Sequence, residues 1–190
     1  MNNLLFNIAG HSIYSKGARA YNGRWEHDYT SELQALVSKY AKELVSGADG
    51  VLRPRWVVIE DCETLSLSNV ISAIGNKGRG IDIHFNDNNR NASGTEVFVH
   101  PATTKENKLL ATNIARGISR ELGVRHRKSG RRAYKYPEES FLGRLAILED
   151  TAIPMVLIEV CFLNSHDLPI YEARKDRVAR VIVEQLNKLL

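Results

Sequence analysis

The chain has 190 residues, of which 43% are hydrophobic and 25% charged, so it can bury the core of one globular domain. Its net charge of +4 and pI of about 9.1 favour an anionic partner, such as nucleic acid, a membrane surface or an anionic cell wall, without choosing among them. The densest basic run, RHRKSGRR at 125–132, is more typical of a solvated loop than of a nucleic-acid-binding patch.

The first part of the chain predicts a strand, a loop and a helix. Residues 3–9 form a short apolar run, and residues 10–27 are rich in Gly, Ser, Arg and Asn, a composition typical of a loop. Asp28 can cap a helix whose apolar face continues to Val45, and Gly47 can end it.

The rest of the chain alternates between apolar runs and segments with helical spacing. The expected strands cover 55–60, 80–85, 95–100 and 154–162. The expected helices cover 65–78, 109–122 and 167–189, and Gly78 and Gly123 can end the first two. The near-continuous apolar run at 154–162 is typical of a central parallel strand. This alternation predicts one α/β domain in which helices cover both faces of the sheet.

The cysteines and the N-terminus exclude several classes of protein. Cys62 and Cys161 form no C-x-x-C pair, which excludes a cysteine zinc site and argues against a disulfide framework, so we expect two small buried side chains. The N-terminus has neither a basic region nor an A-x-A-like cleavage site, and no apolar run is long enough to span a bilayer. We therefore expect no signal peptide and no membrane insertion.

Polar side chains collect near the carboxyl ends of three expected strands, where ligands bind in such sheets. His11 follows the first strand, and His84 and Glu159 lie near the ends of two others. Within GIDIHF, alternation turns Asp82 and His84 away from the apolar residues, and ionisable groups are costly to bury unless they are paired. Two histidines with a carboxylate nearby suit a catalytic Zn²⁺, but a hydrogen-bonded core histidine explains His84 equally well.

Four segments match, in order from residue 9 to the last helix, the sequence blocks of one enzyme family. IAGHS resembles a first-strand P-G-H-G motif, and WEHDYTSELQALVSKYAKEL resembles a glutamate-bearing segment followed by an amphipathic helix. IDIHFNDN and SGTEVFVHP resemble an S-I-H-x-N and G-x-E-x-(F/Y) block. LGRLAILEDTAIPMVLIEVCFLNSHD resembles the most specific block, which contains P-x-(V/I)-L-(V/I)-E-x-G-F. Together they resemble the zinc-dependent N-acetylmuramoyl-L-alanine amidases of type 3, which are cell-wall hydrolases.

The resemblance implies a twisted, mostly parallel sheet flanked by helices, in agreement with the fold expected from the patterns. It also implies one Zn²⁺ per chain, bound by His11, Glu26 and His84, with Glu159 as the catalytic acid and base. Glu26 lies in the expected loop, where a solvated carboxylate is the alternative. The implied reaction is hydrolysis, by a zinc-activated water, of the amide that joins N-acetylmuramic acid to L-alanine in bacterial peptidoglycan.

The chain departs from the family pattern without losing an implied ligand. Ala9 and Ser12 replace the Pro and the second Gly of the first motif, and Cys161 replaces a Gly two residues after the implied catalytic Glu. Asp82 replaces a strand Ser, and its carboxylate can orient either histidine ligand. A buried Asp held by the backbone or by an arginine is the alternative for this position.

Further polar residues are assigned by their place in the sequence. Asn86, Asn88 and Glu96 are candidate substrate contacts. The remaining histidines are expected at the surface rather than at a metal, and His100 could also line the groove; they are His27, His100, His126 and His166.

An implied metal ligand within the first dozen residues and a helix at the end leave no room for a separate cell-wall-binding domain, so we expect 1–190 to be a zinc amidase catalytic domain. Such a domain fits a bacteriophage endolysin, made in the host cytoplasm and released through a holin to lyse the host. Its basic charge would favour anionic wall polymers besides peptidoglycan, and no nucleic acid is expected. The alternatives are an autolysin or sporulation amidase domain, another zinc peptidase, and a non-catalytic wall-binding module, which has no use for Glu159.

Overall fold

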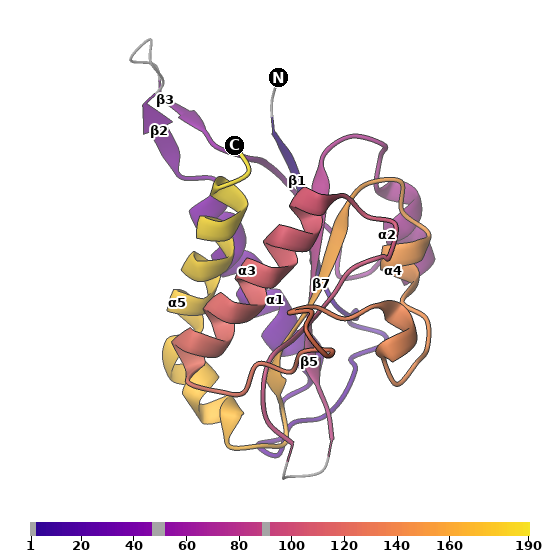
Figure 1. Cartoon of the computed structure of the whole chain (residues 1–190), viewed down its shortest axis with the longest axis vertical. Coiled ribbons are helices and arrows are strands. Elements are labelled where there is room, and N and C mark those ends of the chain that lie inside the picture. Colours follow the sequence, from indigo (N-terminus) through magenta and orange to yellow (C-terminus); the bar gives the residue numbers. More distant parts are fainter. Residues whose placement is uncertain (1–2, 47–51, 89–91) are drawn as a thin grey trace.

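A five-stranded sheet forms the centre of the protein (Figure 1). The computed structural model describes residues 3–46, 52–88 and 92–190. The strands of the sheet, in sequence order, are β1 (Leu4–Ala9), β4 (Val57–Glu60), β5 (Arg79–Asn86), β6 (Glu96–Phe98) and β7 (Met155–Phe162). Their order in space is β4-β1-β5-β7-β6, and all neighbours are parallel except β6, which is antiparallel to β7. The sheet is therefore mostly parallel, as predicted.

Three long helices cover one face of this sheet and two short ones cover the other (Figure 1). The long helices are α1 (Glu26–Ala41), α3 (Lys105–Leu122) and α5 (Asp167–Asn187), and the short ones are α2 (Leu67–Ala73) and α4 (Ala146–Glu149), with a 3-10 turn, η1 (Pro137–Glu139), before α4. The sheet separates two apolar cores, the larger of which lies under the long helices. This arrangement confirms the predicted α/β fold with helices on both faces.

Side-chain alternation along β5 decides which residues enter the larger core. Ile81, Ile83 and Phe85 are buried under the long helices, and each contributes roughly 1.5–3 kcal/mol by leaving water. Asp82 and His84 point away from this core and line a cleft on the other side. The apolar residues of β5 therefore pack in the core, and its polar residues face the cleft.

The first helix begins earlier than the sequence predicts. α1 starts at Glu26, and Asp28 is its third residue rather than its cap. The Asp28 carboxylate accepts the N–H of Trp25, the residue before the helix, at 2.9 Å. A carboxylate in the first turn also interacts favourably with the helix dipole. Glu26 is thus a helix residue with 5% of its surface exposed, which excludes the solvated loop carboxylate.

The same helix also ends earlier than its apolar spacing predicts. α1 ends at Ala41, and the next residues form a short strand, β2 (Leu44–Ser46), paired antiparallel with β3 (Leu52–Pro54). Strand pairing overrides the helical spacing at Leu44 and Val45, so their assignment to the helix is wrong. Gly47, the predicted end, lies outside the described residues.

Other boundaries agree with the sequence or shift by a few residues. α3 begins at Lys105 after Thr104, whose hydroxyl accepts a backbone N–H at 3.2 Å, and Gly123 caps its end with a φ of 69°, as predicted. α2 ends at Ala73, before Gly78. β7 is an interior strand, as predicted, because it lies between β5, to which it is parallel, and the edge strand β6. Its apolar run is continuous because helices cover both faces there.

The two cysteines lie in different environments. Cys161 is buried in the larger core, as expected of a small apolar side chain. Cys62 is exposed in the loop after β4, so the prediction of burial is wrong for this residue. Among the helices that the structure describes, none combines the length and the apolar character needed to cross a lipid bilayer.

Candidate active site

His11 stands at the carboxyl end of β1 in an unusual backbone conformation. Its φ is 72°, the left-handed region that favours glycine, and among the described non-glycine residues it is alone in this. Such a conformation costs about 1–3 kcal/mol and is found mainly where a site requires it. The imidazole Nε2 of His11 lies 2.9 Å from Oε2 of Glu26. The turn after β1 thus aims the ring at the start of α1.

Buried hydrogen bonds between α1 and β1 hold Glu26 opposite this histidine. The Asn7 side-chain amide donates to Gln34 O at 2.9 Å and to Ser38 Oγ at 2.8 Å. The Thr30 hydroxyl donates to Gly10 O at 2.8 Å. Because these contacts lock the helix against the strand, the first turn of α1 has a defined place at the end of β1.

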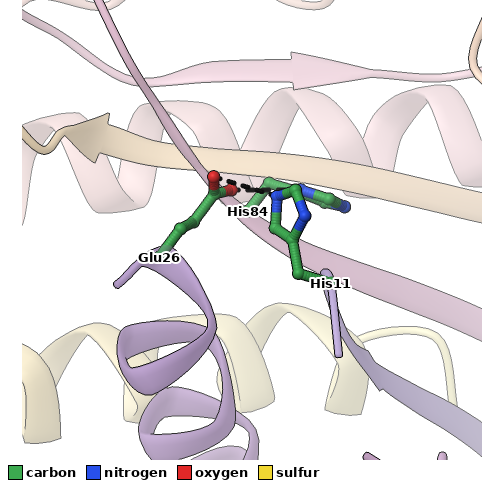
Figure 2. Close-up of side chains that lie close together, drawn as sticks. All are labelled: His11, Glu26 and His84. Atoms are coloured by element: carbon green, nitrogen blue, oxygen red, sulfur yellow. Dashed lines mark hydrogen bonds and ion pairs between the residues drawn. The ribbon is translucent and has the colours of Figure 1, made fainter. Parts of the chain in front are cut away.

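The carboxylate of Glu26 is almost completely enclosed by polar partners. Oε1 lies 3.2 Å from Nδ1 of His84, and Oε2 faces His11 (Figure 2). Oε1 also accepts the Phe85 N–H at 3.0 Å, and Oε2 accepts the Ala18 N–H at 3.2 Å. Burial alone would raise the pKa of Glu26, but the hydrogen bonds from the two histidines outweigh burial and lower it. Glu26 is therefore ionised at neutral pH.

His84 has a carboxylate on each side of its ring. Nδ1 faces Glu26, and Nε2 lies 3.1 Å from Oδ2 of Asp82. Burial lowers the pKa of His84, but the charge and hydrogen bond of Asp82, with that of Glu26, raise it well above its usual value. Because the ring is partly exposed in the cleft, His84 is not a core histidine. Asp82 contacts this histidine rather than an arginine.

The three side chains His11, Glu26 and His84 form a donor set that fits a zinc ion. One ligand atom from each lies within 4.8 Å of the others, and the rings of His11 and His84 are 5.1 Å apart. Two imidazoles and a carboxylate are a common ligand set for catalytic Zn²⁺, which keeps a further position open. The Asp82 carboxylate accepts a hydrogen bond from the ring nitrogen that such a metal would leave free.

Two glycines leave room for this donor set. A Cβ atom on Gly10 would lie 2.4 Å from Cε1 of His84. A Cβ atom on Gly17, whose φ is +72°, would lie 2.6 Å from both Glu26 and His11. Neither position accepts a larger residue without moving a side chain of the donor set. Gly10 is the glycine of the first motif and follows Ala9, which replaces the motif's Pro. The nearby His84 ring explains why this position holds a glycine.

Glu159 lies on β7 beside the donor set. It is the register partner of His84 on β5 and of Glu96 on β6, and its Oε2 is buried without a hydrogen-bond partner in the described structure. Burial raises the pKa of Glu159 to about 8, with the charges of Glu26, Glu96 and Asp82 adding to the rise and that of His84 opposing it. A carboxyl group with such a pKa can both take and return a proton near neutral pH.

A cleft of about 1200 Å³ contains all of these groups. It is lined by the three donor residues, by Asp82 and Glu159, and by residues of the loops at the carboxyl ends of the strands. The geometry of one buried carboxyl group beside two imidazoles and a carboxylate suits a metal-assisted hydrolysis. A family model described as N-acetylmuramoyl-L-alanine amidase matches residues 8–188.

The chain belongs to this family of amidases. It is therefore a hydrolase of the N-acetylmuramoyl-L-alanine amidase class, as the motifs of the sequence indicate. No curated protein sequence matches the chain.

Solved structures share the fold of this amidase. An N-acetylmuramoyl-L-alanine amidase from Clostridium difficile 630 superposes with a TM-score of 0.77 at 21% identity, over 97% of this chain and 95% of that one. The catalytic domain of CwlV from Bacillus (Paenibacillus) polymyxa var. colistinus gives 0.76 at 19%, over 100% and 98%. The catalytic domain of CD27L endolysin, which targets Clostridia difficile, gives 0.70 at 21%, over 97% and 96%. These likenesses show a common fold.

The candidate substrate contacts of the amidase all line the cleft, but they differ in their surroundings. Asn86 and Asn88 lie in the segment that follows the donor residue His84. Glu96 is buried and forms ion pairs with Arg127 and with Lys135, the latter at 3.0 Å. These two cations were missed by reasoning from the sequence, although the basic run 125–132 contains one of them.

None of the other four histidines joins the donor set in the described structure. His27 is buried in α1, so its expected position at the surface is wrong. His126 is partly buried and its Nε2 lies 2.6 Å from Ala133 O. His166 is exposed, and His100 is partly exposed next to Pro101 but is absent from the cleft lining.

Proposed function

We propose that this amidase hydrolyses the amide between N-acetylmuramic acid and L-alanine in peptidoglycan at a site built from His11, Glu26, His84 and Glu159. The observation that carries the proposal is the position of Glu159, a buried carboxyl group with an unpartnered oxygen beside three potential zinc ligands. A non-catalytic wall-binding module would have no need for such a costly group.

Each residue has a separate task in the proposed reaction. His11, Glu26 and His84 hold one Zn²⁺ per chain, and Asp82 keeps the His84 ring in orientation through Nε2. A Zn²⁺ held there would supply Lewis acidity, which would polarise the scissile carbonyl and acidify a water molecule. Glu159 takes a proton from the attacking water and delivers it to the departing amine of L-alanine.

Chemical analysis of digested peptidoglycan tests this function. If the proposal is correct, digestion releases new amino groups on L-alanine in step with loss of the muramic acid amide. New amino groups on other residues would instead identify a peptidase, and new reducing ends would identify a glycosidase. The same digest with heat-inactivated protein is the control.

We also propose that the biological setting is host lysis by a bacteriophage endolysin, made in the host cytoplasm and admitted to the wall through a holin. The fold shared with the CD27L endolysin catalytic domain supports this setting, and the basic charge supports adsorption to an anionic wall. An autolysin or a sporulation amidase is the alternative, since amidases with other names share the fold. Producing the chain in a bacterium with and without a holin separates these settings, because lysis without a holin would contradict the endolysin proposal.

A further inference from the structure

The cleft has a definite order of functional groups across the sheet. The donor residues His11 and His84 belong to β1 and β5, Glu159 belongs to the next strand, β7, and Glu96 belongs to the edge strand β6. Glu96 and Glu159 are register partners, so the two carboxyl groups come from neighbouring positions. A substrate that crosses the cleft from the donor set past Glu159 therefore reaches the edge at β6.

Two cations occupy this edge. Glu96 accepts hydrogen bonds from the Arg127 guanidinium and from Nζ of Lys135. The Arg127 and Lys135 side chains are 31% and 17% exposed, and both line the cleft. Two positive charges thus face one carboxylate that lies between them, and the edge keeps a surplus of positive charge.

The backbone holds both cations in place. The segment that carries them runs beside β6: the Arg127 N–H donates to Thr95 O at 2.9 Å, and the Lys135 N–H donates to Val97 O at 2.8 Å. Gly94 permits this approach, because a Cβ atom on it would lie 2.2 Å from Arg125 O. Lys128, an exposed cation of the same run, does not line the cleft.

Donor capacity remains on both side chains after Glu96 is satisfied. A guanidinium carries several N–H donors in a planar fork that suits a carboxylate, and an ammonium can donate to more than one acceptor. Both groups line the cleft and are only partly exposed to water. An anion entering the cleft would meet them in a partly desolvated setting, where a charge-assisted hydrogen bond is stronger than at the surface.

The chemistry of the reaction says which part of the substrate reaches this edge. On the proposed function, Glu159 delivers its proton to the departing amine, so the peptide side of the scissile amide lies next to Glu159. Beyond Glu159 the described part of the sheet continues to its edge strand, β6. The peptide stem carries free carboxylates, whereas the sugar side of the amide is neutral.

We propose that Arg127 and Lys135 form a subsite that binds a carboxylate of the stem peptide. The subsite sets the direction of the substrate in the cleft, with the acidic peptide over β6 and the muramic acid on the far side of the donor set. This inference rests on the proposed function, because it takes the direction of the scissile bond from the role of Glu159.

The test uses one batch of purified peptidoglycan, left untreated or with its peptide carboxylates converted to carboxamides by carbodiimide and ammonia. The readout is the initial rate of appearance of L-alanine amino groups. The unmodified enzyme should act about ten-fold faster on the untreated polymer, the size expected from the loss of one charge-assisted contact. Lys135→Met, which keeps Arg127, should act more slowly on the untreated polymer and show a clearly smaller preference for it.

Lys135→Met is the informative variant, because Arg127 remains as a partner for buried Glu96. Lys128→Met is the matched control: it removes the same charge from an exposed position of the same loop and should keep the preference. Equal rates of the unmodified enzyme on the two polymers, or a preference that is as large in Lys135→Met as in the unmodified enzyme, would overturn the inference. If the unmodified enzyme releases no L-alanine amino groups from either polymer, the proposed function itself fails.

Discussion

Oδ2 of Asp82 lies 3.1 Å from Nε2 of His84, on the opposite side of the ring from the nitrogen that faces Glu26. The two residues are separated by one position on β5, and alternation places them on the same face of the sheet. The second oxygen of Asp82 is buried without a hydrogen-bond partner in the described structure. Such a carboxylate is costly to bury, and orientation of a metal ligand is a reason to retain it.

Asp82→Asn should weaken zinc affinity or turnover by roughly 10- to 100-fold, the usual effect of losing the partner of a metal-bound histidine. The Asn side chain keeps the shape of Asp but has no negative charge. It therefore binds the N–H of the His84 ring more weakly. Zinc affinity is measured by competition with a chromophoric chelator, and turnover on purified peptidoglycan. Unchanged values of both would leave Asp82 with a purely structural role.

Gly10→Ala should displace the His84 ring and reduce zinc occupancy without unfolding the protein. The added Cβ would lie 2.4 Å from this ring, a distance that real structures do not tolerate. Gly75→Ala is the matched control, because a Cβ atom there meets nothing within 4 Å. Elemental analysis and circular dichroism of both variants give the answer. Normal zinc content in Gly10→Ala would mean that His84 is not held where the structure places it.

Removal of the metal should abolish hydrolysis, and stoichiometric Zn²⁺ should restore it. On the proposed function, chelation would withdraw the group that polarises the carbonyl, and Glu159 alone could only move protons. The measurement is activity against zinc content, which should rise together to one ion per chain. Full activity in protein shown to be metal-free by elemental analysis would refute zinc as the cofactor.

Salt should weaken adsorption of the enzyme to whole cell walls, because its net charge of +4 acts on anionic polymers over a distance that ions screen. Cosedimentation with walls should fall between about 0.01 and 0.15 M salt, where the screening length drops from roughly 30 to 8 Å. Walls stripped of their anionic polymers serve as the control and should bind less at low salt. Salt-independent binding would argue against an electrostatic contribution.

The sequence predicted the parts of this site that depend on local patterns. Period-two alternation places Asp82 and His84 together, and the end of an apolar run locates His11. Glu26 could not be found in this way, because its place depends on where α1 begins and on the packing of that helix against β1. Only the family motif indicated it.

The cations at the edge of the sheet illustrate a second limit. Arg127 lies 31 positions from Glu96 in the sequence, and the two meet because an irregular segment pairs with β6. No periodic pattern marks such a segment, and composition alone favours a solvated loop at 125–132. Leu44 and Val45 show the reverse case, in which a helical pattern is present but strand pairing decides the structure.

Glu159→Gln separates proton transfer from metal binding in this cleft. The substitution nearly preserves shape, but an amide cannot take and return the proton, so turnover should fall by about 10²- to 10⁴-fold. Since Glu159 is not a member of the donor set, zinc content and fold should stay unchanged. Glu184→Gln, at an exposed position on α5, is the matched control and should behave as the unmodified enzyme.

The decisive measurement is zinc content, circular dichroism and turnover on purified peptidoglycan, all on the same Glu159→Gln sample. We expect a folded, zinc-loaded and nearly inactive protein. Near-normal turnover would show that another group moves the proton. Loss of zinc from a folded sample would place Glu159 among the metal ligands and contradict the assignment of Glu26.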